Sequence, residues 1–161
     1  MLLLELLLLR TLFMAKRRKI KKKKLSPILQ ILNICKAYSD LVIRREIKND
    51  NYYVVLRIKP TETSIAYDVK LVASKSYKPM VFIIKPTPKK LFNGLEKIPH
   101  VYSKKEARIC LFYGQEITLD SDYTKIVPWI SEWLFHFEIW KITGKWCGGG
   151  HTISQRELID F

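Results

Sequence analysis

Four segments rich in β-branched and aromatic residues follow one another in the first half of the chain, and only short gaps separate them. They read LVIRREIK (41–48), NYYVVLRIK (51–59), IAYDVKLVA (65–73) and MVFIIK (80–85). Such residues favour strands, and the gaps hold the Asn, Asp, Pro and Ser that are typical of turns. A crossover between parallel strands needs about a dozen residues or more, which these gaps lack. The sequence therefore predicts a four-stranded antiparallel meander.

A helical pattern precedes the meander. In SPILQILNICKAY (26–38), apolar residues recur at three- and four-residue spacing. Ser26 can cap a helix at its start, and Pro27 suits its first turn. The pattern predicts a helix over 27–38.

A second helical pattern begins at Pro128, and Gly144 can end it. One predicted face carries its large apolar residues, which are Ile130, Trp133, Leu134, Phe137 and Trp140. We also expect a short last helix in TISQRELIDF (152–161). Helix, meander and C-terminal helices together predict an α+β fold in one domain over residues 25–161.

The segments between the meander and the second helical pattern are less regular. Residues 86–107 contain three prolines and no sustained period, which predicts a long loop of the kind that often carries function. RICLFY (108–113) favours a short extended segment, and we expect a further loop over residues 114–127.

The first 24 residues form an extension of unusual composition. MLLLELLLLRTLF (1–13) is shorter than the ~20 residues of a membrane span, and the basic run KRRKIKKKK (16–24) follows it, whereas a secretory signal has the opposite order. Three interpretations remain open. Met14 is the true start, or the extension is an interfacial helix with a polybasic patch on anionic lipid, or it is a helix that packs on the domain.

The net charge of +14 depends strongly on the basic run, which holds eight of the 29 Lys and Arg residues. The rest of the chain is only mildly basic, and it lacks aromatic residues interleaved with Lys or Arg in an RNA-binding pattern. We therefore expect no specific nucleic-acid partner and no transmembrane segment.

The cysteines argue against a metal or disulfide protein. Three cysteines stand far apart, no C-x-x-C occurs, and no His, Cys and Asp cluster has metal-ligand spacing. No glycine-rich loop opens a helix after a strand, so we expect no phosphate cradle, no cofactor, no metal and no means of activating a carboxylate with ATP. Free thiols favour a reducing, cytoplasmic compartment.

Most of the remaining chemistry-bearing residues are expected to be structural. Cys35 falls on the apolar face of the first helix, and Cys147 stands beside three glycines without a base that points to function. We expect His136 and His151 at the surface. The four tryptophans (129, 133, 140 and 146) suit the core and rim of the last helix rather than a cage.

Three motifs, in this order, resemble the ubiquitin-conjugating enzyme family. SYKPMVFIIKP (76–86) is similar to the family's Tyr-Pro…Pro-Pro segment, which ends the fourth strand. IPHVYSKKEARICLFY (98–113) is similar to its active-site segment, in which a His-Pro-Asn triplet begins ten residues before the catalytic Cys. His100 and Cys110 have that spacing, and a Trp-bearing helix, WISEWLFHFEIW (129–140), follows as in the family.

The resemblance covers about residues 26–147, with informative departures. Val101 and Tyr102 stand at the family's Pro and Asn positions, and Phe112 stands where the family has Asp. The family's Asn supports the oxyanion that forms when an amine attacks the thioester. VPWISEWLFHFEIWKITGKWCGGG (127–150) is similar to a bacterial branch encoded beside cyclic-oligonucleotide synthases in anti-phage (CBASS) operons.

This resemblance implies a ubiquitin-conjugating (UBC-like) fold and a cysteine-dependent acyl transferase. Cys110 would carry a protein C-terminus as a thioester, and His100 and Tyr102 would support it, His100 by hydrogen bonds from its ring to the backbone. The implied partner is a cyclic-oligonucleotide synthase of the same operon, and whether a separate activating enzyme also takes part stays open. Lys104, Lys105 and Arg108 could favour the thiolate, and on a strand Arg108 and Cys110 would project to the same side.

Three functions stay open at this point. Besides the enzyme, the same fold can serve as a binding module without chemistry, in which case Cys110 is a buried structural cysteine between Ile109 and Leu111. The third is a nucleic-acid or membrane-surface binder that acts through the basic run.

Overall fold

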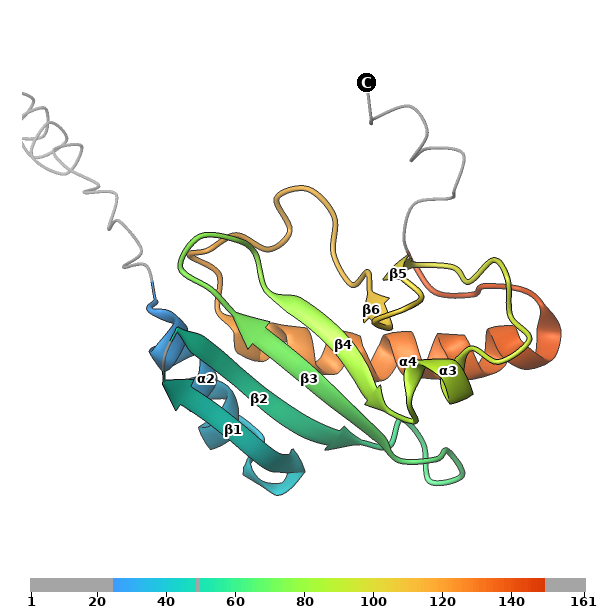
Figure 1. The fold of residues 1–161 in the computed structure, drawn as a ribbon, viewed down its shortest axis with the longest axis horizontal. Helices are drawn as coiled ribbons and strands as arrows, with labels where there is room; N and C mark the ends of the chain where they lie inside the picture. Colours follow the sequence, from blue (N-terminus) through green and yellow to red (C-terminus); the bar gives the residue numbers. More distant parts are fainter. Residues whose placement is uncertain (1–24, 49, 150–161) are drawn as a thin grey trace, which may run out of the picture.

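A computed structural model describes residues 25–48 and 50–149, which form an α+β domain around one six-stranded antiparallel sheet (Figure 1). The strands lie in the order β1-β2-β3-β4-β6-β5. Their bounds are β1 Val42–Lys48, β2 Asn51–Ile58, β3 Tyr67–Ala73, β4 Met80–Lys85, β5 Val101–Ser103 and β6 Arg108–Ile109. The helices are α2 Pro27–Ala37, α3 Pro88–Leu91 and α4 Ile126–Thr143, with 3₁₀ turns η1 Ser39–Leu41 and η2 Tyr123–Lys125. The interpretations of residues 1–24, of His151 and of a helix over 152–161 lie outside the described residues.

The structure confirms the first helix and its cap. In α2, the Ser26 hydroxyl accepts a hydrogen bond from the backbone N–H of Leu29, and Pro27 occupies the first turn. Ile31 and Ile34 are fully buried because their spacing places both on the side that faces the sheet.

The antiparallel meander is also confirmed. Each of β1, β2 and β3 pairs with the next strand along the chain, as short hairpin connections require. The alternate residues Val54, Leu56 and Ile58 of β2 point into the core, so the register of the sheet is set by burial of one face. Helices α2 and α4 lie on the same side of the sheet, behind it in Figure 1.

The long C-terminal helix is confirmed, and it begins earlier than expected. Helix α4 starts at Ile126 rather than Pro128, because Ile126 and Val127 are buried and a proline is tolerated in a first turn. It ends at Gly144, whose φ of 69° is the left-handed conformation that glycine adopts easily. Within the described ranges, no helix combines the length and the apolar composition that a membrane crossing requires.

The long loop was the least accurate prediction. Residues 86–107 contain α3 and β5, and only Arg108 and Ile109 of the expected extended segment 108–113 form a strand. Strand β6 pairs with β4 through Phe82 and Arg108 and with β5 on its other side. Such short strands exist because of partners distant in the sequence, so no local pattern indicates them.

A polar contact fixes α4 against the sheet. The Glu138 carboxylate accepts hydrogen bonds from the Ser64 hydroxyl at 2.6 Å and from the Tyr67 hydroxyl at 2.9 Å. Burial, together with the hydrogen bond to Glu138, raises the pKa of Tyr67 above its usual range. The contact holds α4 beside β3, and the helix also lies near the segment after β6 that carries Cys110.

Candidate active site

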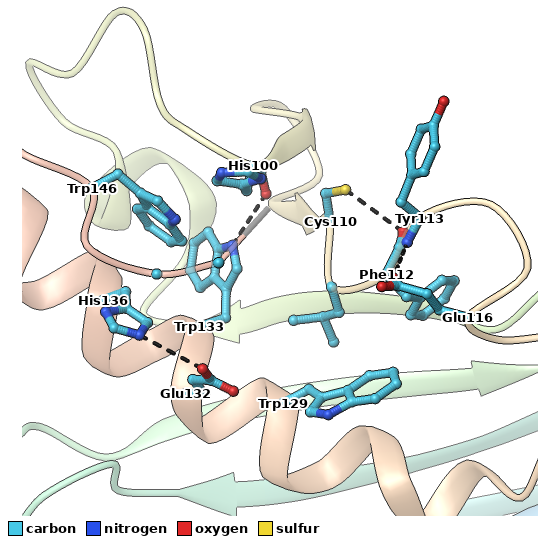
Figure 2. A pocket seen from close by; sticks show the side chains of 13 residues that line it. His100, Cys110, Phe112, Tyr113, Glu116, Trp129, Glu132, Trp133, His136 and Trp146 are labelled. Carbon is cyan, nitrogen blue, oxygen red and sulfur yellow. Dashed lines mark hydrogen bonds and ion pairs between the residues drawn. The ribbon is translucent and has the colours of Figure 1, made fainter. Parts of the chain in front are cut away.

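Cys110 follows the last residue of β6 and is partly buried. Its backbone N–H donates a hydrogen bond of 2.8 Å to the carbonyl of His100, which holds the segment after β6 against the segment before β5. Its Sγ lies 3.9 Å from the carbonyl oxygen of Phe112 (Figure 2). The backbone contact with His100 therefore fixes the chain segment that carries the thiol.

The ten-residue spacing between His100 and Cys110 corresponds to this direct backbone contact. The same His100 carbonyl also accepts a hydrogen bond of 3.2 Å from Nε1 of Trp133, so it connects the Cys110 segment to α4 (Figure 2). His100 has a φ of 54°, an uncommon conformation for a residue other than glycine. Its ring lies against Trp146, with 4.9 Å between the ring centroids. The two hydrogen bonds that connect His100 to Cys110 and Trp133 use its carbonyl oxygen.

A hollow of about 320 Å³ opens beside Cys110 (Figure 2). Four parts of the chain line it: His100 before β5, the segment from Cys110 to Glu116, one stripe of α4, and the residues after α4. The stripe of α4 consists of Trp129, Glu132, Trp133 and His136. These four residues recur at three- and four-residue spacing and therefore share one side of the helix.

The prediction that His136 lies at the surface is wrong. Its side chain is only 16% exposed, and its Nε2 lies 3.8 Å from a carboxylate oxygen of Glu132. The chain after Gly144 folds back over it, so that Trp146 and Gly148 pack against the imidazole. A Cβ at Gly148 would come within 2.7 Å of the His136 ring, so this return path requires glycine. Nδ1 of His136 is buried and has no hydrogen-bond partner among the described residues.

The tryptophans form core and rim, as predicted, and also walls of the hollow. Trp133 is buried and stacks on Phe137, with 5.1 Å between the ring centroids. Trp129, Trp133 and Trp146 line the hollow, whereas Trp140 packs on the core away from it. The sequence missed the tryptophan contribution to the site because the fold-back after Gly144 brings Trp146 to α4.

Tyr102 and Arg108 lie at a second hollow, of about 130 Å³. The Arg108 guanidinium lies 5.0 Å from the centroid of the Tyr102 ring, and the Tyr102 side chain is exposed. Arg108 lines this second hollow and Cys110 lines the first, although a continuous strand would place both on one side. Strand β6 ends at Ile109, so the alternation of side chains does not extend to Cys110.

The other two cysteines lie where the sequence placed them. Cys35 is partly buried and packs against the hydrophobic core, and Cys147 is exposed. Neither lines the hollow beside Cys110. In the part of the chain that the structure describes, no three His, Cys, Asp or Glu side chains are grouped as metal ligands.

Two carboxylates of the hollow, those of Glu116 and Glu132, were not predicted from the sequence. Glu132 belongs to the stripe of α4 that lines the hollow. A helical projection of the sequence could have identified this stripe as a polar and aromatic side next to the apolar face. Glu116 accepts a hydrogen bond of 2.6 Å from the backbone N–H of Tyr113. No sequence signal identifies Glu116, although its backbone N–H donates to the Tyr113 carbonyl in a turn that brings its side chain to the hollow. The site thus combines one reachable thiol, aromatic walls and two carboxylates.

Comparison with known proteins assigns the chain to a family. The family model described as Type II CBASS E2 protein matches residues 30–153, which include Cys110 and every residue that lines the hollow. No curated protein matches the chain. The match indicates an E2-like role in CBASS anti-phage defence, and the chain belongs to the Type II CBASS E2 protein family.

Proposed function

We propose that Cys110 carries the C-terminus of another protein as a thioester and transfers it to an acceptor. The observation that supports this proposal best is the position of the thiol: of the three cysteines, Cys110 is the one that lines the hollow between the short strands and α4. A thioester carrier needs a thiol that two proteins can reach and that can leave as thiolate. The proposed fold is UBC-like, in keeping with the sheet, the helices and the family.

The proposed cargo is a cyclic-oligonucleotide synthase of the same operon, whose activity the transfer would regulate. The family supports a partner encoded in a CBASS operon. Because the sequence offers no phosphate cradle, activation of the cargo's carboxyl group would fall to a separate enzyme. Co-expression with the neighbouring operon proteins tests the proposal, since a covalent adduct that thiol reductant releases should appear on non-reducing gels.

A binding module without chemistry is the alternative, and the departures from the family pattern favour it. Val101, Tyr102 and Phe112 replace residues that ubiquitin-conjugating enzymes have around their cysteine. A binding module predicts no adduct at any cysteine and full function when Cys110 is replaced.

Tyr102 is the proposed substitute for the missing Asn, through its hydroxyl as a hydrogen-bond donor. Its place at the second hollow requires that the thioester carbonyl turn toward Arg108 and Tyr102 rather than toward α4. We expect Tyr102→Phe to slow transfer by about 10²–10³, the usual effect of losing one oxyanion donor, and to leave loading of Cys110 unchanged. Single-turnover discharge of loaded protein measures this effect, and equal rates for both proteins would remove Tyr102 from the mechanism.

A further inference from the structure

Helix α2 carries apolar side chains on two opposite sides. Ile31 and Ile34 face the sheet and are fully buried. Ile28, Leu29 and Leu32 form its outward face, where they are 41%, 47% and 38% exposed. Their three- and four-residue spacing keeps them together on one side of the helix. A surface helix usually has polar or charged residues on its outward side, so an aliphatic outward face indicates a binding surface.

Basic residues surround this outward face. The run KRRKIKKKK (16–24) holds eight Lys and Arg residues and ends just before α2 begins. Lys36 is exposed one turn after Leu32 and therefore lies on the same side of the helix. Arg45 of β1 is exposed and pairs with Val54, whose side chain is buried in the core, so Arg45 projects on the helix side of the sheet. Aliphatic side chains and basic charge thus occur together at α2.

A membrane surface that contains anionic lipid fits this combination better than a nucleic acid does. Phosphate contacts dominate the binding of basic proteins to nucleic acid, and they give exposed aliphatic side chains no apolar surroundings. A membrane offers negative headgroups and, directly beneath them, acyl chains. The apolar segment MLLLELLLLRTLF (1–13) stands on the other side of the basic run in the sequence. The run therefore has apolar residues both before and after it.

We propose that the outward face of α2 and the basic run dock the protein on the surface of an anionic membrane. Ile28, Leu29 and Leu32 contact the acyl chains at the interface, while the basic run and Lys36 contact the lipid phosphates. The strength of such a contact grows with the apolar area that enters the interface and with the attraction between basic residues and anionic lipid. The contact lies on the membrane surface and requires no spanning helix.

The docking face is separate from the candidate active site. In the sheet order β1-β2-β3-β4-β6-β5, α2 packs on β1 to β3, whereas Cys110 follows β6. Figure 1 shows α2 and β6 at different ends of the domain. No residue of the outward face lines either hollow beside Cys110. Docking can therefore be measured on the unloaded protein, and the result does not depend on the proposed thioester.

Cosedimentation of the full-length chain with vesicles tests the charge contribution. One set of vesicles contains equal parts of phosphatidylglycerol and phosphatidylcholine, and the other contains phosphatidylcholine alone. We expect binding to the anionic vesicles only, and weaker binding as the salt concentration rises, because ions screen the attraction. Replacing the four lysines 21–24 with glutamine should weaken binding by about a hundredfold or more, since each basic residue near such a surface contributes to it.

A second variant tests the outward face of α2, with Ile28→Gln, Leu29→Gln and Leu32→Gln combined. Glutamine is a good helix former and the three positions are exposed, so α2 should stay folded, which circular dichroism checks. We expect binding to the anionic vesicles to weaken by about tenfold or more, because three aliphatic side chains no longer enter the interface.

The matched control makes the same chemical change at three exposed isoleucines outside α2. It combines Ile65→Gln, Ile84→Gln and Ile142→Gln, and none of these residues lines a hollow. This control should bind the anionic vesicles as the natural protein does.

Four results would overturn the inference. One is no binding to the anionic vesicles, or equal binding to both kinds of vesicle. Another is an outward-face variant that binds as tightly as the control, which would leave the basic run as the only contact. A third is a DNA duplex that binds at least as tightly as the anionic vesicles at the same salt concentration. The fourth is a natural protein that is dimeric while the outward-face variant is monomeric in sedimentation equilibrium, which would show that a second copy covers α2.

Discussion

Replacing Cys110 with alanine is expected to abolish the covalent adduct with the partner protein and, with it, protection against phage. The proposed chemistry has no second nucleophile, since Cys35 packs against the core and Cys147 does not line the hollow. The side chain of Cys110 is only partly buried, so the loss of its sulfur should leave the fold intact. Non-reducing gels after co-expression and plaque counts measure the two losses.

Cys35→Ala and Cys147→Ala are the matched controls for this experiment. Both remove a thiol of the same chain, and both should form the adduct and protect as the natural protein does. We expect a modest loss of stability at Cys35 alone, because its side chain contacts the core. Full protection by Cys110→Ala would favour the binding module instead.

Replacing Trp133 with alanine is expected to have the largest effect on stability among residues of the site. The indole is 4% exposed, stacks on Phe137, and donates its N–H to the His100 carbonyl. Removing a buried ring of this size costs about 3–5 kcal/mol of the free energy of unfolding. The same change frees the His100 segment from α4, so we also expect Cys110 loading to fall.

One variant separates the ring of Trp133 from its hydrogen bond, and a second serves as a control at another position of the helix. Trp133→Phe keeps an aromatic ring and loses the N–H, which should cost roughly 1 kcal/mol beyond the change in packing. Trp140→Ala removes a partly buried tryptophan of the same helix away from the hollow, and its cost should be clearly smaller. Urea unfolding followed by circular dichroism gives the three values. A loss below about 1 kcal/mol for Trp133→Ala would contradict the expected contribution of this ring to stability.

The sequence predicted those parts of the fold that local pattern determines. The cap at Ser26, the alternation along the meander and the stop at Gly144 all depend on residues close in the chain, and all are confirmed. Strands β5 and β6 depend on pairing with a distant strand, as Phe82 with Arg108. No periodicity in two or three residues can reveal such pairing.

The candidate site also has one part that the sequence predicts and another part that it does not. The spacing of His100 and Cys110 could be read from the sequence, and it corresponds to a backbone hydrogen bond in the structure. The hollow could not be predicted, because it requires the fold-back that brings Trp146 and Gly148 onto His136. The charge of the hollow is also hidden in the sequence, since Glu116 and Glu132 come from separate elements of a strongly basic chain.

The thioester at Cys110 is tested most directly by mass spectrometry of the Cys110→Ser variant after co-expression with the neighbouring operon proteins. A serine in this position should accept the same C-terminus as an ester, which is less activated than a thioester and resists thiol reductant. The account predicts a peptide in which the C-terminus of the partner is joined to residue 110, stable to reductant, alongside a reductant-sensitive adduct in the natural protein. A partner joined at any other residue, or no joined peptide in either protein, would contradict it.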